Sequence, residues 1–240
     1  MRISTAYLSE KGGREKNDDT VCIRRKENKL CVFVGDGLGG YDNGKFASET
    51  AAQTIIEYYD QQDFLDETYM CSAVRQANQI ILEQQIARNS TMKTTIVVLG
   101  IDDLKARWMH VGDSRLYHFK NGKIIDQTMD HSVSQIAVLM GEISQKEIRF
   151  HEDRNRVLRA LGSDNAKPDI SKLAIIDGKK EAFLLCTDGF WEYVYEEEME
   201  EALRKAKTPE QWVEKMRVIL EKRVPKGNDN YTAAAVFLEK

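Results

Sequence analysis

Aspartate residues recur where apolar segments of the chain end or begin. Mainly apolar runs lead into Asp36, Asp113 and Asp188, each of which has a glycine beside it. Two further acidic groups, at 17–19 and 228–230, stand just before apolar runs. If these runs are strands, the five acidic groups can converge on one edge of the sheets.

Several carboxylates at one place repel one another and lose hydration, so an uncompensated cluster is unfavourable. Divalent cations such as Mg²⁺ or Mn²⁺ remove that conflict, and two of them about 3.5–4 Å apart can activate water while neutralising a phosphate. A single Asp-Gly pair is most simply a turn that ends a strand. The repeated apolar lead-in favours a shared metal site, with Asp36, Asp188 and Asp229 at its centre.

Short strands and blocks of helix would position these residues. Helical spacing and capping patterns predict helices at 44–59, 66–88, from about 196, and from 208 to about 225, with short helices and loops over 130–162. Asn121-Gly122 indicates a type I′ hairpin, and Ser144 with Glu147 a capping box. Apolar runs rich in β-branched or aromatic residues predict strands at 2–8, 20–25, 30–35, 94–101, 106–111, 115–119, 123–126, 170–176, 181–186 and 231–238.

Runs of antiparallel strands with helices in separate blocks indicate an α+β architecture in which helices cover stacked sheets. The chain is 42% apolar and 31% charged, which is typical of a sizeable core beneath a solvated surface. Because no repeat or composition shift marks a boundary, one domain spanning 1–240 is expected.

Composition excludes several classes of protein. A formal net charge of −4 with dispersed lysine and arginine disfavours nucleic-acid binding. No apolar run approaches the roughly 20 residues that span a bilayer, and residues 1–10 are too polar for a signal peptide, so a cytoplasmic protein without membrane contact is expected. The four cysteines lie far apart without a Cys-x-x-Cys pair, and we expect them to be reduced.

Three alternative chemistries fit the sequence poorly. None of the cysteines is followed six positions later by an arginine, which excludes a cysteine phosphatase. Residues 35–40 have the letters of a dinucleotide-binding loop, but 44–88 is nearly all helix where a second strand should follow. A haloacid-dehalogenase-type phosphatase needs Asp-x-Asp after a strand, and the chain contains no such triplet.

In order and spacing, a series of segments resembles the metal-dependent serine/threonine protein phosphatases of the type 2C family, particularly the compact bacterial form. The matches extend over essentially the whole chain. They are Gly13 to Asp19, Asp36 to Gly40 with Gly44, Met92 to Thr95, Val111 to Tyr117, Asp130 to Ser132, Arg154 to Gly162, Thr187 to Gly189 with Trp191, and Asp229-Asn230 with Thr232.

The resemblance implies a four-layer αββα sandwich, in which two central antiparallel sheets are flanked by helix pairs. It also implies two Mn²⁺ or Mg²⁺ ions. Asp36 would bridge both ions, the Gly37 carbonyl would bind one, and Asp188 and Asp229 would bind the other. The expected reaction is direct attack of a metal-bridging hydroxide on phosphorus, without a phosphoenzyme.

Further residues acquire roles from the same resemblance. Asp19, with Asp18, would hold metal-bound waters, and Asp113 would help to bind a third, weaker ion. Arg14 would clamp the substrate phosphate, because a guanidinium offers paired donors to phosphate oxygens. The expected substrates are phosphoserine and phosphothreonine in proteins modified by a cognate kinase, and the protein is expected to be a monomer.

The sequence also departs from the family pattern. Asp18 replaces a glutamate, Leu38 replaces a methionine or histidine, and Lys93 replaces a glycine. Residues from about 130 to 162 resemble the family's flap, a segment next to the active site. The alternative function is a catalytically silent phosphatase fold that serves as a binding or regulatory module.

Overall fold

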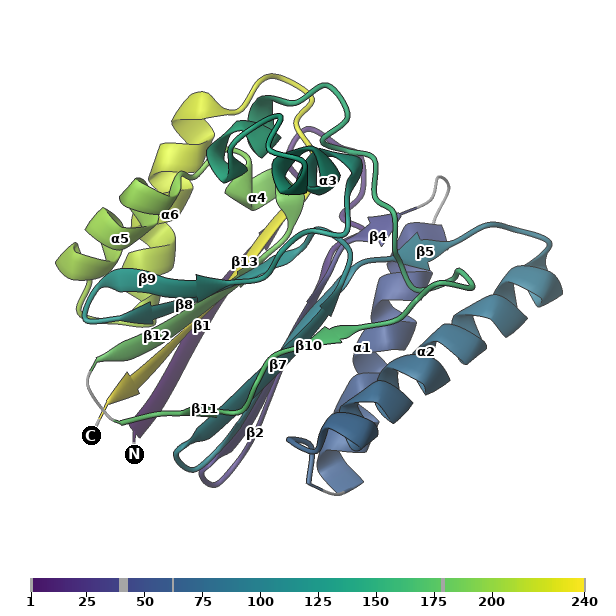
Figure 1. Cartoon of the computed structure of the whole chain (residues 1–240), viewed down its shortest axis with the longest axis horizontal. Coiled ribbons are helices and arrows are strands. Elements are labelled where there is room, and N and C mark those ends of the chain that lie inside the picture. Colours follow the sequence, from purple (N-terminus) through teal and green to yellow (C-terminus); the bar gives the residue numbers. More distant parts are fainter. Residues whose placement is uncertain (1, 39–42, 62, 178–179, 240) are drawn as a thin grey trace.

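The structure is a computed structural model that describes residues 2–38, 43–61, 63–177 and 180–239. Two antiparallel sheets lie face to face, and a pair of helices covers the outer face of each (Figure 1). This arrangement confirms the α+β sandwich of four layers. Gly39 and Gly40 of the glycine-rich motif lie outside the described residues.

The strands are divided between two large sheets and one small one. The β13 sheet has the order β1 (Arg2–Glu10), β13 (Tyr231–Glu239), β12 (Glu181–Cys186), β8 (Arg115–Lys120) and β9 (Lys123–Gln127). The β6 sheet has the order β10 (Asp169–Ile170), β7 (Lys105–Val111), β6 (Ile96–Asp102), β3 (Lys29–Gly35) and β2 (Thr20–Lys26), and β11 (Ala174–Ile175) also pairs with β7. The small sheet joins β4 (Gly37–Leu38) to β5 (Lys93–Thr94).

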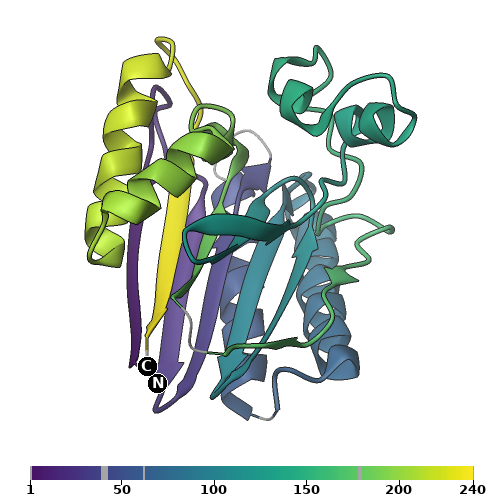
Figure 2. The same cartoon turned by 60° about the vertical axis from the view of Figure 1, so that its left-hand side comes forward.

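The helices pack on the two outer faces. Figure 2 shows them flanking the sheets from the side. The β6 sheet is covered by α1 (Asn43–Gln61) and α2 (Glu67–Arg88), and the β13 sheet by α5 (Glu196–Lys205) and α6 (Pro209–Arg223). Three short helices follow β9 or β12: α3 (Val133–Leu139), the 3-10 helix η1 (Gln145–Phe150) and α4 (Asp188–Trp191). No helix in the described ranges is long and apolar enough to cross a membrane.

Strand β3 shows why some runs in the sequence are continuously apolar. Successive side chains of a strand point to opposite faces of the sheet. Cys31 and Phe33 pack towards α1 and α2, whereas Leu30, Val32 and Val34 pack against the β13 sheet. Both faces are buried, and each large apolar side chain contributes about 1.5–3 kcal/mol by leaving water.

Local turn signals are confirmed. Asn121 and Gly122 have φ values of 52° and 75°, as a type I′ turn requires. The Ser144 backbone N–H donates to the Glu147 carboxylate at 2.7 Å, which closes the capping box at the start of η1.

Two predicted strands are wrong in extent. Residues 170–176 form the short strands β10 and β11, because the Ser171 hydroxyl accepts the Trp108 backbone N–H at 3.0 Å in place of a strand carbonyl. Residues 94–101 are divided into β5 and β6 at Thr95, whose backbone N–H donates to the Asp36 carbonyl at 2.9 Å. The second break lies at the acidic residues and serves to hold one of them.

Candidate metal centre

The strand register brings the aspartates to one end of the sandwich. In the β6 sheet, Thr20 at the start of β2 pairs with Gly35 at the end of β3, so Asp19 and Asp36 stand at the same edge. In the β13 sheet, the end of β12 pairs with the start of β13, which places Asp188 and Asp229 at one edge. Because the two sheets are stacked, these edges meet.

Electrostatic interactions show that five carboxylates share this space. Loss of hydration raises the pKa of Asp36 well above its ordinary value, and the charges of Asp188, Asp19, Asp113 and Asp229 raise it further. Burial and the neighbouring carboxylates likewise raise the pKa of Asp188 well above its ordinary value. The structure therefore collects the acidic groups that the sequence singled out; we call these five residues the acidic centre.

Two threonines hold the backbone of Asp36. The Asp36 N–H donates to the Thr95 hydroxyl at 3.1 Å, and the Thr94 hydroxyl donates to the Asp36 carbonyl at 2.9 Å. Together with the Thr95 N–H on the same carbonyl, these bonds fix the turn after β3. The paired threonines just before β6 were visible in the sequence, but their contact with Asp36 was not.

A close backbone contact explains the glycines after Asp36. A Cβ atom on Gly37 would lie 2.3 Å from the Gly44 carbonyl oxygen, and one on Gly44 would lie 2.4 Å from the Gly37 carbonyl oxygen. The same contact includes Asp18, whose Oδ2 would be 3.2 Å from the Gly44 Cβ. Only glycine at both positions allows β4 and α1 to touch here.

Asp19 is held by hydroxyl groups and retains a free oxygen. The Thr187 hydroxyl donates to Asp19 Oδ2 at 2.9 Å, while the buried Oδ1 has no hydrogen-bond partner within the described part of the chain. Burial raises the pKa of Asp19 to about 7, against the hydroxyl groups of Thr232 and Thr187, which lower it. One oxygen of this buried carboxylate is thus available to a further donor or cation.

Asp113 has a similar environment. Its side chain is buried, and Oδ1 has no hydrogen-bond partner among the described residues. Burial, together with the charge of Asp130, raises the pKa of Asp113 to about 7. Its backbone carbonyl accepts the Trp191 indole N–H at 2.9 Å, which ties it to α4.

Asn230 is a positioning residue to which the sequence assigned no role. Its Oδ1 accepts the Asp18 backbone N–H at 2.8 Å, and its Nδ2 donates to the carbonyls of Lys11 and Lys16 at 2.9 and 2.8 Å. The side chain is buried. A buried amide directly after Asp229 was the available clue, because such a group must find partners.

Arg14 lies at the rim of the acidic centre. Its Nε and Nη2 donate to the two carboxylate oxygens of Asp229 at 3.0 and 2.8 Å. Both side chains are about half exposed, at 56% and 49%. The hydrogen bonds and charge of Asp229, with the charges of Asp188 and Asp36, raise the pKa of Arg14. The structure therefore places this arginine beside the predicted metal ligands.

The donor set fits hard divalent cations. It consists of carboxylate oxygens, of which those of Asp19 and Asp113 named above have no hydrogen-bond partner among the described residues, and of a glycine carbonyl beside them. Oxygen ligands of this kind are what Mg²⁺ and Mn²⁺ prefer. Cations would also remove the repulsion between carboxylates that raises the pKa of Asp36 and Asp188.

A second group of possible metal ligands is satisfied by hydrogen bonds. His110, His131 and Asp169 have ligand atoms within 4.8 Å of one another. His131 Nδ1 accepts the Gly112 N–H at 3.1 Å, so the ring proton is on Nε2, 3.2 Å from the Asp169 carboxylate. The Arg159 guanidinium, 3.3 Å from the same Nε2, would repel a cation.

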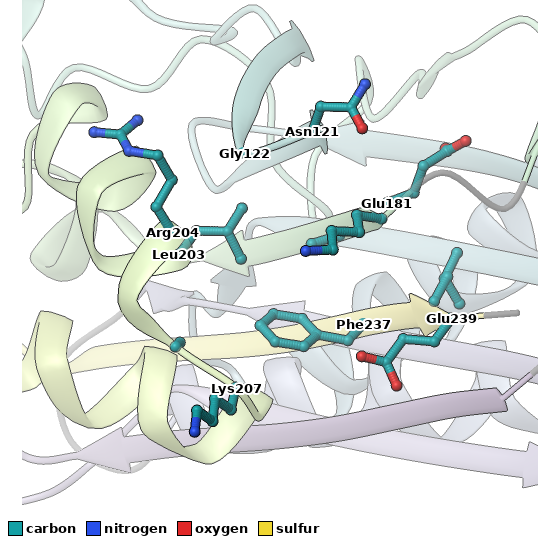
Figure 3. Close-up of a pocket in the computed structure, with 12 residues that line it drawn as sticks. Asn121, Gly122, Glu181, Leu203, Arg204, Lys207, Phe237 and Glu239 are labelled. Carbon is teal, nitrogen blue, oxygen red and sulfur yellow. The ribbon is translucent and has the colours of Figure 1, made fainter.

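A large cavity lies elsewhere. It has a volume of about 680 Å³ and is lined by Asn121, Leu203, Arg204 and Phe237 among others (Figure 3). Asn121 lies in the turn between β8 and β9, and Leu203 and Arg204 lie on α5. Phe237 lies near the end of β13, so the cavity is at the opposite end of this sheet from the acidic centre. The Arg204 guanidinium points away from Phe237 in Figure 3. The charged residues of the lining have both signs, unlike the carboxylates of the acidic centre: Lys180, Arg204, Lys207, Glu181 and Glu239.

Comparisons with known proteins agree with one another. A family model described as protein phosphatase 2C matches residues 9–226. The serine/threonine phosphatase stp of Listeria monocytogenes serotype 4b is 31% identical over 204 residues, which are 81% of this chain and 80% of that protein. The solved structure of the serine/threonine phosphatase PstP/Ppp of Mycobacterium tuberculosis has a TM-score of 0.85 and 26% identity over 99% of both chains. The PstP catalytic domain in complex with two manganese ions has a TM-score of 0.84 and 24% identity, again over 99% of both chains.

Proposed function

The chain belongs to the protein phosphatase 2C family, and we propose that it hydrolyses phosphoserine and phosphothreonine in proteins with the help of divalent cations. The observation that carries this function is the acidic centre. Five carboxylates from distant parts of the chain meet there, and burial with mutual repulsion raises the pKa of Asp36 and Asp188 well above the ordinary value. A protein that only needed stability would not retain such a group.

Each residue of the centre has a defined role in this proposal. Asp36 would hold both of two Mn²⁺ or Mg²⁺ ions, the Gly37 carbonyl would hold one of them, and Asp188 and Asp229 would hold the other. The ions would supply charge that neutralises the phosphate and would lower the pKa of a water molecule so that it attacks phosphorus directly. The two manganese ions in the related PstP structure support this number.

The remaining acids act around that pair. Asp19 and Asp18 would hold waters at the ions, and Asp113 would help to hold a third, weaker ion. The buried Oδ1 atoms of Asp19 and Asp113, which have no hydrogen-bond partner in the part of the chain that the structure describes, support these roles. Thr187 keeps Asp19 in place for this task through its hydroxyl group.

Arg14 binds the phosphate of the substrate. Its fork already holds a carboxylate, and the same two donors match phosphate oxygens. The pair with Asp229 is half exposed and worth no more than about 1 kcal/mol, so exchange for a phosphate is inexpensive. The arginine then leaves Asp229 available to a cation.

The proposed function extends to the cellular setting of the protein. The protein is a single domain and a monomer that acts in the cytoplasm on the products of a separate serine/threonine kinase, with residues 130–162 as a flap beside the site. The named relatives are serine/threonine phosphatases, which supports phosphoproteins as substrates. The complete set of acids favours this enzyme over a silent binding module.

The proposal is tested by hydrolysis of phosphorylated peptides. Phosphate release from phosphoserine and phosphothreonine peptides should require Mn²⁺ or Mg²⁺, stop with EDTA, and fall by about a thousandfold in Asp36→Asn. Asp164→Asn, which changes an exposed aspartate in the same way, should retain full activity. Absence of metal-dependent release by the wild-type protein would leave the silent module as the function.

A further inference from the structure

A cluster of buried charged and aromatic side chains lies beside the acidic centre. Arg115 is 1% exposed and donates to the two carboxylate oxygens of Asp130 at 2.8 and 2.7 Å. The Arg115 guanidinium carbon lies 3.4 Å from the centre of the Trp191 ring. Since Asp130 begins segment 130–162, this pair fixes the start of that segment against α4.

Arg149 makes a second link from the same segment. It belongs to η1, is buried, and donates from Nη1 to the Trp191 carbonyl at 2.8 Å. Its Nη2 donates to both carboxylate oxygens of Glu196, at 2.7 and 2.6 Å. The Tyr117 hydroxyl donates to Glu196 at 3.2 Å and accepts from Arg115 at 3.1 Å. The two arginines thus belong to one closed network around Trp191.

Trp191 connects this network to the acidic centre in two ways. Its indole N–H donates to the Asp113 backbone carbonyl at 2.9 Å. It also ends the single turn of α4, which begins with Asp188. In Figure 1, α4 lies between the ends of the β13 sheet and the segment that carries α3. A displacement of Trp191 would therefore move both aspartates.

We propose that Arg149 is a positioning residue for the acidic centre: it holds the Trp191 end of α4 and so sets where Asp113 and Asp188 present their carboxylates. This rests on the proposed function, in which both aspartates bind cations. A guanidinium is required because it reaches the Trp191 carbonyl and the Glu196 carboxylate together, whereas a lysine ammonium cannot reproduce this planar fork.

The first test measures Mn²⁺ binding directly, from the electron paramagnetic resonance signal of free Mn²⁺. Arg149→Lys should raise the dissociation constant of Mn²⁺ about tenfold, because loss of the fork lets α4 shift. The KM for p-nitrophenyl phosphate should change by less than about twofold, while kcat at a fixed low Mn²⁺ concentration falls. Arg156→Lys is the matched control, since Arg156 lies in the same segment, is 69% exposed and pairs with Asp153.

A second variant separates positioning from folding. Trp191→Phe retains an aromatic ring and the backbone carbonyl but removes the N–H that Asp113 accepts. It should also weaken Mn²⁺ binding, and the double variant with Arg149→Lys should be weaker by less than the product of the two single effects. If Arg149→Lys does not fold, Mn²⁺ binding by Trp191→Phe tests whether the position of Trp191 controls the acidic centre, and unchanged affinity would overturn the inference.

The outcomes distinguish this inference from the proposed function. Mn²⁺ affinity in Arg149→Lys within about twofold of wild type, or single effects that multiply independently, would overturn the positioning role. A wild-type protein that binds Mn²⁺ but releases no phosphate would refute the proposed function alone, because the binding measurements need no turnover.

Discussion

Two groups of buried charges lie next to each other in this protein, and they are balanced in opposite ways. In the acidic centre, like charges face one another, and burial with mutual repulsion raises the pKa of Asp36 and Asp188. Beside it, Arg115 and Asp130 form a forked pair, each with a side chain 1% exposed. The first group becomes favourable only with cations, whereas the second is neutral within the chain.

The comparison teaches how the fold tolerates the acidic centre. The carboxylates stand at the ends of strands whose side chains are mainly apolar and buried in the core. The paired charges join segment 130–162 to residues beside the acidic centre, where they can hold backbone groups without adding net charge. We therefore expect the paired charges to contribute mainly to stability and the acidic centre mainly to function. Substitution of one residue in each set tests this expectation.

The largest effect on stability should come from breaking the buried pair. Arg115→Met should lower the free energy of unfolding by about 3–5 kcal/mol, because Asp130 would keep a buried charge without its partner. Urea unfolding in EDTA measures this change. Arg217→Met, which removes a partly exposed arginine on α6, should lower the free energy of unfolding far less, because solvent screens its ion pairs. Equal losses in the two variants would remove the contrast between the regions.

The acidic centre should respond with the opposite sign. Asp188→Asn should raise the free energy of unfolding of the metal-free protein by about 1–2 kcal/mol, because it removes one of the repelling charges. Thermal unfolding should show a rise of about 2–4 °C per kcal/mol. With Mn²⁺ the order should reverse, since the wild type gains stability by binding the ion. If Asp188→Asn were less stable than wild type in EDTA, repulsion between the carboxylates would not be what destabilises the metal-free protein.

Low pH should destabilise the fold through a third kind of buried group, the imidazole of His110. Burial, with the neighbouring His131, lowers the pKa of His110 to about 4 from its ordinary 6.5. Between these values the unfolded chain binds a proton that the folded chain does not, so this contribution to stability is lost as the pH falls from about 6.5 towards 4. Asp169 and Asp130 oppose the shift.

His110→Gln isolates this contribution. Glutamine can still donate to the Met129 carbonyl, which His110 Nε2 contacts at 2.7 Å, but it does not titrate. Between pH 7 and pH 5 the wild type should lose about 1–2 kcal/mol more than the variant in urea unfolding. Parallel losses in the two proteins would show that folding does not lower the pKa of His110.

The smallest change in stability is expected at the rim. Arg14→Met should alter the free energy of unfolding by less than about 1 kcal/mol, because its pair with Asp229 is half exposed. The same variant should raise the KM for a phosphopeptide about tenfold through loss of the phosphate contact. An unchanged KM would exclude Arg14 from substrate binding.

Local sequence patterns predicted much of the fold. Strand β3 and the turn at Asn121-Gly122 were predicted because an apolar run and a pair of residues that tolerate positive φ act over a few positions. The predicted strand at 170–176 was wrong because the Ser171 side chain takes a hydrogen bond that the backbone would otherwise make. Such competition depends on what lies opposite in the sheet, and the local pattern does not contain it.

For the acidic centre too, some features follow from the local sequence and others depend on contacts across the fold. The sequence by itself determined which aspartates are candidates, because each follows or precedes an apolar strand, and antiparallel strands bring such ends to common edges. Only the tertiary structure decided that Thr187 bonds Asp19 across 168 residues, and that Arg149 reaches the Trp191 carbonyl. These contacts join single side chains on different elements, so no periodicity marks them; their positions follow from how the layers pack.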